Sequence, residues 1–141
     1  MQVLLDYINE LNWLAVVVAS MAAFASGAVW YAEPVFGKIW MKMVGLTRKD
    51  TEKGNMPKTM GLSFLATIVS AMAIGVLVQV LDLSTALQGA SLGIMVAVGI
   101  LATNKLMMAQ FEMRPLGYSV LTLGGDVVAL GIMGAILAVW Q

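Results

Sequence analysis

The sequence predicts an all-α protein: an integral membrane bundle of four transmembrane helices, with a short amphipathic cytoplasmic helix between the first and the second. Of the 141 residues, 60% are hydrophobic and 11% are charged, whereas a soluble domain carries about 25% charged residues. A soluble fold of this length could not bury so much apolar surface. The apolar residues also gather in runs long enough to cross a bilayer, which takes about 20 helical residues. We therefore expect a single membrane domain over residues 1–141.

Four apolar runs define the expected spans. Residues 11–32, 59–81 and 83–104 carry no charge, and residues 115–141 carry one, Asp126. These runs predict helices at about 12–31, 59–81, 84–108 and 116–139. The runs are continuously apolar, whereas the strands of a membrane barrel alternate between apolar and polar residues. The alternation that a barrel requires is therefore missing.

The basic residues predict the orientation. All eight Lys and Arg residues lie in or beside the first and third connections, and none lies in either tail or in the second connection. The positive-inside rule then places loops 33–58 and 109–115 in the cytoplasm and both termini outside, in the periplasm. The expected location is the cell inner membrane. Aromatic residues at the end of the first span and just after it (Trp30, Tyr31, Phe36 and Trp40) are expected to anchor the inner interface.

The first connection predicts two short helices. Apolar residues recur at helical spacing from Val35 to Val44 and predict an amphipathic helix lying on the cytoplasmic membrane surface. Gly45 is the expected end of this helix. Thr47 and Asp50 have the spacing of a capping box, which predicts that a further helical turn begins there.

Small residues predict where helices approach closely, because membrane helices associate through close packing and polar contacts. They repeat at every fourth position in the first span, and they form a GxxxG motif in the third. The expected packing residues are Ala15, Ala19, Ala23, Gly27, Gly89 and Gly93. Such faces serve either contacts within the chain or contacts between copies. A homo-oligomer or a membrane-protein partner is accordingly expected, in addition to the lipid bilayer.

Asp126 is the candidate intramembrane polar site. Counted from Pro115, it lies about 16 Å into the fourth span, near the midplane, where a charge costs about 2.5 kcal/mol or more. Thr122 and Ser119 share its helix face. Two interpretations stay open: a proton or cation site, or a single carboxyl group that joins helices. Ser63, Thr67 and Ser70 form a hydroxyl stripe on the second span, and this stripe could complete a polar seam.

A second candidate site lies at the turn before the fourth span. Its polar residues are Asn104, Lys105, Glu112 and Arg114. Lys105 is long enough to place its ammonium at the interface. Two interpretations are weighed for this group, a binding site and a solvated turn.

Several function classes find no support in the residues. The chain has no His and no Cys, and it contains no phosphate-binding loop, zinc-protease motif or nucleophile elbow. We therefore expect no enzyme activity, no cofactor and no metal. The net charge of zero also predicts no nucleic-acid partner, because such binding needs a basic surface.

Two motifs carry a family resemblance. They are Trp30-Tyr31-x-x-Pro34-x-Phe36-Gly37-Lys38-x-Trp40-Met41 and, before the last span, Phe111-Glu112-x-Arg114-Pro115. With Asn12-Trp13-Leu14-Ala15 and Gly45-Leu46-Thr47, they resemble a mostly bacterial family of small membrane proteins, domain of unknown function 1761. The resemblance covers essentially the whole chain. It implies four spans and no particular activity, and it makes Glu112 and Arg114 worth testing.

Two functions follow as hypotheses. The first is a non-enzymatic accessory or scaffold component, which self-associates or binds a membrane partner through its small-residue faces. The alternative is a small transporter or channel that uses Asp126 to pass a proton, a cation or a small solute.

Overall fold

The computed structural model describes residues 1–141, and the chain is helical throughout. Four helical runs are long and apolar enough to cross a membrane, as the sequence predicted, and each observed end lies within three residues of the expected one. The runs are α2 (Trp13–Trp30), α5 (Met56–Val80), Ala86–Phe111 and α8 (Leu116–Val139). The third is built from α6 (Ala86–Val96), a π-helical segment η2 (Ala97–Ala102) and α7 (Thr103–Phe111).

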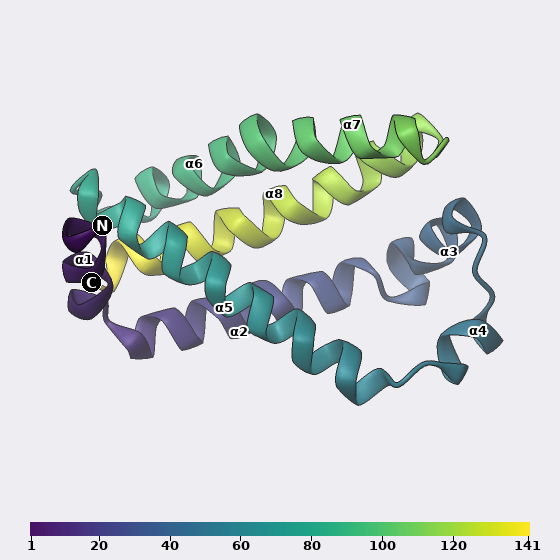
Figure 1. Cartoon of the computed structure of the whole chain (residues 1–141), viewed down its shortest axis with the longest axis horizontal. Coiled ribbons are helices and arrows are strands. Elements are labelled where there is room, and N and C mark those ends of the chain that lie inside the picture. The colour runs from purple at the N-terminus through teal and green to yellow at the C-terminus, as the bar shows by residue number, and fades with distance from the viewer.

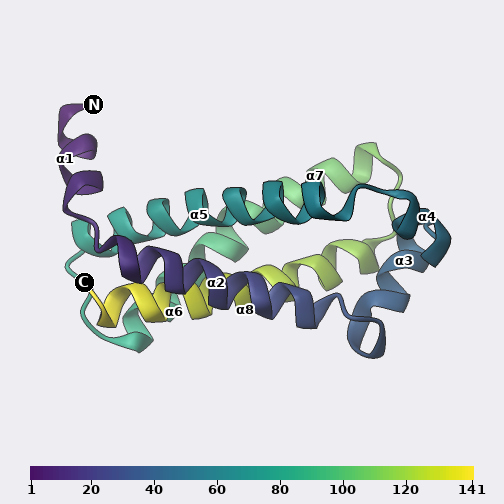
Figure 2. The ribbon, with the colours of Figure 1, turned by 90° about the horizontal axis from the view of Figure 1, so that it is seen from below.

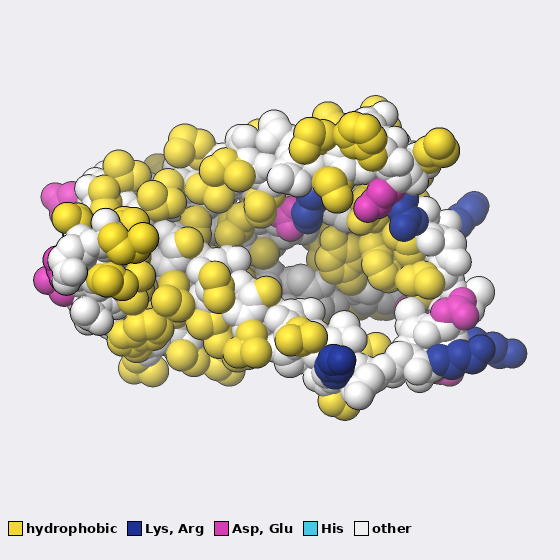
Figure 3. Space-filling model, viewed as in Figure 1, with side chains coloured by type: hydrophobic (Ala, Val, Ile, Leu, Met, Phe, Trp, Pro, Cys, Tyr) yellow, Lys and Arg dark blue, Asp and Glu magenta, His cyan; other side chains and the backbone are white.

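The long helices run up and down along one axis (Figure 1). Both termini lie at one end of the molecule, and the connection between α2 and α5 lies at the other end. The turn from α7 to α8 lies at that second end as well. This second end carries most of the Lys and Arg side chains (Figure 3), and we call it the basic end. The arrangement agrees with the predicted grouping of loops; which end faces the cytoplasm stays a prediction.

The connection between α2 and α5 contains three short helices. They are η1 (Glu33–Gly37), α3 (Lys38–Val44) and α4 (Arg48–Lys53). Gly45 ends α3 in the left-handed conformation, with φ 73°, which glycine adopts without a Cβ clash. The capping box of Thr47 and Asp50 is present at the start of α4. Both local predictions are confirmed, whereas the position of α3 on a membrane surface stays a prediction.

The sequence predicts only an N-terminal tail before the first span, but residues Gln2–Glu10 form a helix, α1. Figure 2 shows that α1 is turned across the axis of the long helices, at the end where the termini lie. Its nine residues are too few for a span. The hydropathy runs used to find the spans could not detect it.

The π-helical segment η2 explains how the third run keeps one face against α8. That face repeats at every fourth residue, through Gly89, Gly93, Ala97, Leu101, Lys105 and Ala109, and each of these is at least partly buried. In a regular α-helix each step of four residues rotates the face by about 40°, so that five steps would rotate it by about 200°. A π-helical turn is wider and rotates less per residue. We infer that η2 absorbs the drift and keeps Lys105 turned toward α8.

The packed core lies in the half of the bundle nearest the termini. It joins Val16 and Ala19 of α2, Ile74 of α5 and Met133 of α8, each at most 2% exposed, with other buried apolar residues. In α5 the buried residues begin only at Ala71. The half of α5 near the basic end therefore lies away from its neighbours, and it leaves a space between α5, α2 and α8.

The predicted packing residues contact helices of the same chain. Ala15, Ala19 and Ala23 are buried in the core. A Cβ atom on Gly89 would overlap the carbonyl oxygen of Gly134, and one on Gly93 would overlap that of Leu130. Gly27 is the exception, because a Cβ there would meet nothing within 4 Å. Five of the six predicted positions therefore serve contacts within the chain.

Candidate functional site

A cavity of about 550 Å³ occupies the space between α2, α5 and α8. Trp40 of α3 lies at its edge near the basic end, and Met133 lies on its wall toward the packed core. Figure 3 shows a hollow between the helices in this half of the molecule. The volume falls in the range of small-molecule sites, about 300–1,000 Å³.

Asp126 lies on the wall of this cavity and forms an ion pair with Lys105 of α7. Lys105 Nζ donates to Asp126 Oδ2 at 2.5 Å. The two side chains keep 38% and 22% of their exposed area, respectively. The sequence predicted a single carboxyl group or an ion site at Asp126, and it placed Lys105 with the turn, near the interface. In the structure the Lys105 ammonium is directed to Asp126.

Helix geometry explains why these two side chains meet. Lys105 precedes the end of α7 at Phe111 by six residues, about 9 Å, and Asp126 follows the start of α8 at Leu116 by ten residues, about 15 Å. The Cα–Cβ bonds of a helix tilt toward its N-terminus. Because α7 and α8 run in opposite directions, Lys105 leans away from the basic end and Asp126 leans toward it. The opposite tilts of the two side chains make up the difference of about 6 Å between the depth of Lys105 and the depth of Asp126 in the bundle.

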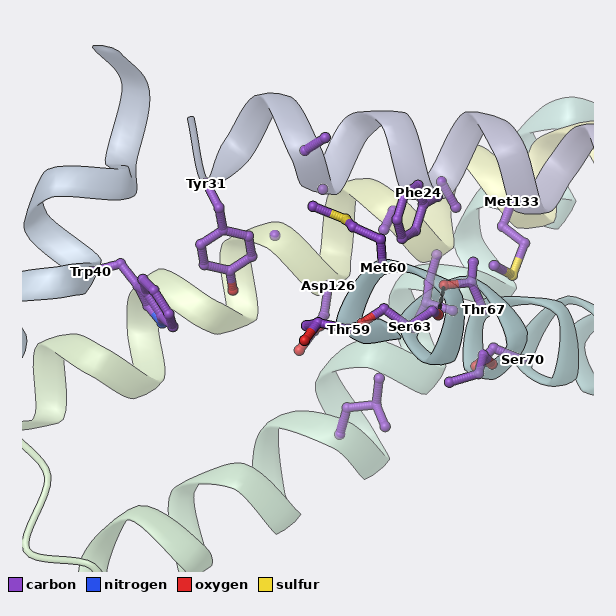
Figure 4. A pocket seen from close by; sticks show the side chains of 18 residues that line it. Phe24, Tyr31, Trp40, Thr59, Met60, Ser63, Thr67, Ser70, Asp126 and Met133 are labelled. Atoms are coloured by element: carbon purple, nitrogen blue, oxygen red, sulfur yellow. Dashed lines mark hydrogen bonds between the residues drawn. The ribbon is translucent and has the colours of Figure 1, made fainter. Parts of the chain in front are cut away.

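The hydroxyl stripe of α5 faces the same cavity (Figure 4). The Thr67 hydroxyl donates to the carbonyl of Ser63 at 2.9 Å, and the Ser70 hydroxyl donates to the carbonyl of Ala66 at 3.1 Å. The Thr67 and Ser70 hydroxyls thus donate their protons to carbonyls of their own helix. Their oxygen lone pairs stay available to accept a hydrogen bond. The stripe and Asp126 line the same cavity, and no hydrogen bond joins them.

Aromatic side chains form the wall of the cavity near the basic end. Tyr31 and Trp40 pack edge to face with ring centroids 5.7 Å apart, and Phe24 lies deeper. In Figure 4 the Tyr31 hydroxyl points toward the side of the cavity where Asp126 lies. Tyr31 and Trp40, which the sequence predicted to be interface anchors, also line the cavity. Their position next to the end of a span was the available signal.

Trp30 lies against α8 and fixes α2 to it. Its indole covers a notch made by Gly124 and Gly125, where a Cβ on Gly124 would come within 2.5 Å of the ring. The indole Nε1 donates to the carbonyl of Leu121 at 3.1 Å. This contact holds α2 beside α8 at the level of Asp126, and α5 is left free to diverge.

Ser119 and Thr122 do not line the cavity. Both are buried on α8. The Thr122 hydroxyl donates to the carbonyls of Tyr118 and Ser119 at 3.0 and 3.2 Å. The Ser119 hydroxyl is buried without a hydrogen-bond partner. These two residues share a helix with Asp126, but they belong to the packed side of α8.

The candidate turn site divides into separate parts. Glu112 and Arg114 form an exposed ion pair at 3.5 Å, and the Arg114 guanidinium lies over the ring of Tyr118, 5.7 Å from its centroid. Asn104 is exposed, and Lys105 forms its ion pair with Asp126 and not with a residue of the turn. No three acidic side chains come together as a set of metal ligands.

Comparison with known proteins gives a family and no activity. No curated protein and no solved structure matches the chain. Residues 14–138 match a family described as "Protein of unknown function (DUF1761)". This match covers the four long helices, the cavity and the Lys105–Asp126 pair. The chain therefore belongs to the DUF1761 family.

Proposed function

We propose that this protein is a multi-pass membrane protein that binds a small solute in its intramembrane cavity and carries it across the bilayer. The observation that supports this most directly is the position of Asp126, an acidic side chain on the wall of a cavity of about 550 Å³. Ionisable groups at this depth are costly and mark solute or ion pathways in membrane proteins. An ion pair that served only to join α7 and α8 would not require an open space beside it.

The outer faces of the long helices suit lipid. Leu62, Leu65 and Val69 of α5 are each more than half exposed, and such a surface would be costly in water. The basic end would face the cytoplasm by the positive-inside rule. The inner membrane and the periplasmic position of the termini are part of the proposal.

The cavity lies in the half of the bundle near the basic end. The lining begins near the basic end, at Thr59 and Trp40, and the packed core of α2, α5 and α8 closes the space beyond Met133. A continuous pore is therefore absent from this conformation. The proposal is a carrier that is open toward the basic end, and the packed half has to open for release on the other side.

An accessory or scaffold role is the second hypothesis. It has less support, because the small-residue faces that would bind a partner are packed within the chain. The expected docking faces were the small-residue stripes of α2 and α6. The alanines of α2 are buried, and Gly89 and Gly93 lie against the backbone of α8. A second copy or a partner would have to use other surfaces.

Cysteine labelling tests the proposal, because the chain has no cysteine of its own. Ser63→Cys and Thr67→Cys place a thiol in the cavity, and Leu62→Cys and Val69→Cys place one on the outer face of the same helix. A membrane-impermeant methanethiosulfonate reagent is added to either side of sealed vesicles. Because the thiolate that attacks the reagent forms readily only in contact with water, we expect the cavity thiols to react at least about tenfold faster, and only from the cytoplasmic side.

Three results would contradict the proposal. Unreactive cavity thiols would mean that the space is dry and closed to solutes. Equal reactivity at all four positions, from the same side, would mean that α5 does not lie in lipid. Labelling of the cavity positions from the periplasmic side alone would reverse the proposed direction of access.

A further inference from the structure

Only one of the two carboxylate oxygens of Asp126 is engaged. Oδ2 accepts the Lys105 ammonium at 2.5 Å, and the structure gives Oδ1 no hydrogen bond. Asp126 also lines the cavity, whereas Lys105 does not. A solute in the cavity therefore meets the acid and not the base.

The cavity wall favours a cationic solute. Asp126 and Tyr31 are the titratable residues among those that line it, and no Lys or Arg is among them. The rings of Phe24, Tyr31 and Trp40 offer faces that attract organic cations through their quadrupoles. The wall itself offers an anion no basic side chain, and the nearby ammonium of Lys105 is already paired with Asp126. A divalent metal would find a single carboxylate and no imidazole or thiolate ligand.

We propose that Asp126 binds the ammonium group of a small organic cation, and that Lys105 is a resident competitor for the same carboxylate. One carboxylate cannot neutralise two ammonium groups in a medium of low dielectric constant. A bound cation therefore displaces Nζ from Oδ2, and the Lys105 side chain swings away from Asp126. The charged groups that face Asp126 are thus Lys105 from α7 and the solute, with the neutral phenol of Tyr31 beside them. This inference rests on the proposed carrier function and assigns its class of substrate.

Competition predicts opposite effects for the two members of the pair. The probe is benzyltrimethylammonium, a permanent cation with an aromatic body, and its affinity is measured by calorimetry on the purified protein in detergent. We expect Lys105→Met to bind the probe at least about tenfold more tightly than the unmodified protein, because the resident cation is gone. Lys105→Arg keeps the competing charge and should bind about as weakly as the unmodified protein. The double variant K105M/D126N has no unpaired charge that would impair folding, and it should not bind.

A matched pair of glycine variants places the binding in the cavity. A Cβ on Gly27 or on Gly61 meets nothing within 4 Å, but only Gly27 lines the cavity. Gly27→Leu should therefore abolish binding of the probe, and Gly61→Leu should leave it unchanged. Both substitutions replace a helical glycine by a better helix former, so their effects on the helix itself are similar.

The outcomes separate this inference from the proposed function. Weaker binding by Lys105→Met would show that Lys105 supports the site, and it would overturn the competition. Equal effects of the two glycine variants would place the probe elsewhere and overturn the site. If no variant binds the cation while the Ser63→Cys and Thr67→Cys thiols still react from the cytoplasm, the substrate class is wrong and the accessible cavity stands.

Discussion

The Lys105–Asp126 pair makes a strong prediction about stability, which a double-mutant cycle can measure. The three variants are Lys105→Met, Asp126→Asn and the double substitution K105M/D126N. Each single variant leaves one member of the pair without its partner. The double variant removes both charges and keeps side chains of similar length.

The geometry sets the expected size of the effect. Removing one partner of a fully buried ion pair costs about 3–5 kcal/mol, because the other charge is left uncompensated. Here the side chains keep 38% and 22% of their exposed area, so that we expect each single variant to lose about 2–3 kcal/mol. The double variant should lose only about 1 kcal/mol, which gives a coupling energy of about 3–5 kcal/mol, at or above the upper end of the range for residues in contact.

Equilibrium unfolding in mixed micelles, followed by helical circular dichroism, supplies the four free energies. Neutral hydrogen-bonded pairs in a membrane protein couple by about 0.6 kcal/mol on average. A coupling near that value would refute the reasoning, because it would make the pair an ordinary polar contact. Losses that simply add in the double variant would lead to the same conclusion.

Three further predictions use other parts of the molecule. Gly93→Leu should lower the free energy of unfolding by about 3 kcal/mol or more, because its side chain overlaps a carbonyl of α8, whereas Gly99→Leu in the same span meets open space and should cost less than about 0.5 kcal/mol. Trp30→Phe keeps a ring on the glycine notch but loses the hydrogen bond to α8, so the same assay should show a loss of about 0.6 kcal/mol. The side-chain and backbone hydrogen bonds from Thr47 lower the pKa of Asp50 below its ordinary value of 3.8, so the stabilisation of α4 by the cap is present above pH 3.8 and is lost as the pH falls through the lowered pKa. An NMR titration of Asp50 should show a higher midpoint in Thr47→Ala than in the unmodified protein. An unchanged midpoint would contradict the assignment.

The four long helices were predictable because a bilayer imposes one strong rule, a long apolar run for each crossing. Gly45 and the capping box were predictable for a different reason, since both are local and depend on a few neighbouring residues. Neither kind of signal reveals η2. Its trace in the sequence is the face from Gly89 to Ala109, which repeats at every fourth residue for longer than a regular α-helix can keep one side.

The site was only half predictable. The depth of Asp126 follows from counting along α8, but its partner requires the relation between two helices. Lys105 was grouped with the turn because it lies close to the turn along the chain. The opposite tilt of side chains on antiparallel helices was the missing step, and it moves Lys105 away from the interface and toward the acid. Tyr31 and Trp40 lie where a span end and a cavity edge coincide at the basic end, so the signal for an interface anchor does not by itself reveal a cavity wall.

The distribution of small residues explains why one half of the bundle is packed and the other is open. Toward the termini, Ala15, Ala19, Gly89 and Gly134 let backbones meet, and close packing is what holds helices together in lipid. Toward the basic end, α5 presents hydroxyl side chains to the cavity instead of an interlocking apolar face. The ion pair of Lys105 with Asp126 lies on the α8 wall of this open half, where α7 and α8 stay together while α5 diverges. A carrier that alternates its access has to separate the packed half, and the close glycine contacts of α6 with α8 make that pair the rigid one. Trp30 and the buried alanines also hold α2 to α8. In the proposed carrier the movable element is therefore α5, whose half near the basic end already lies away from α8.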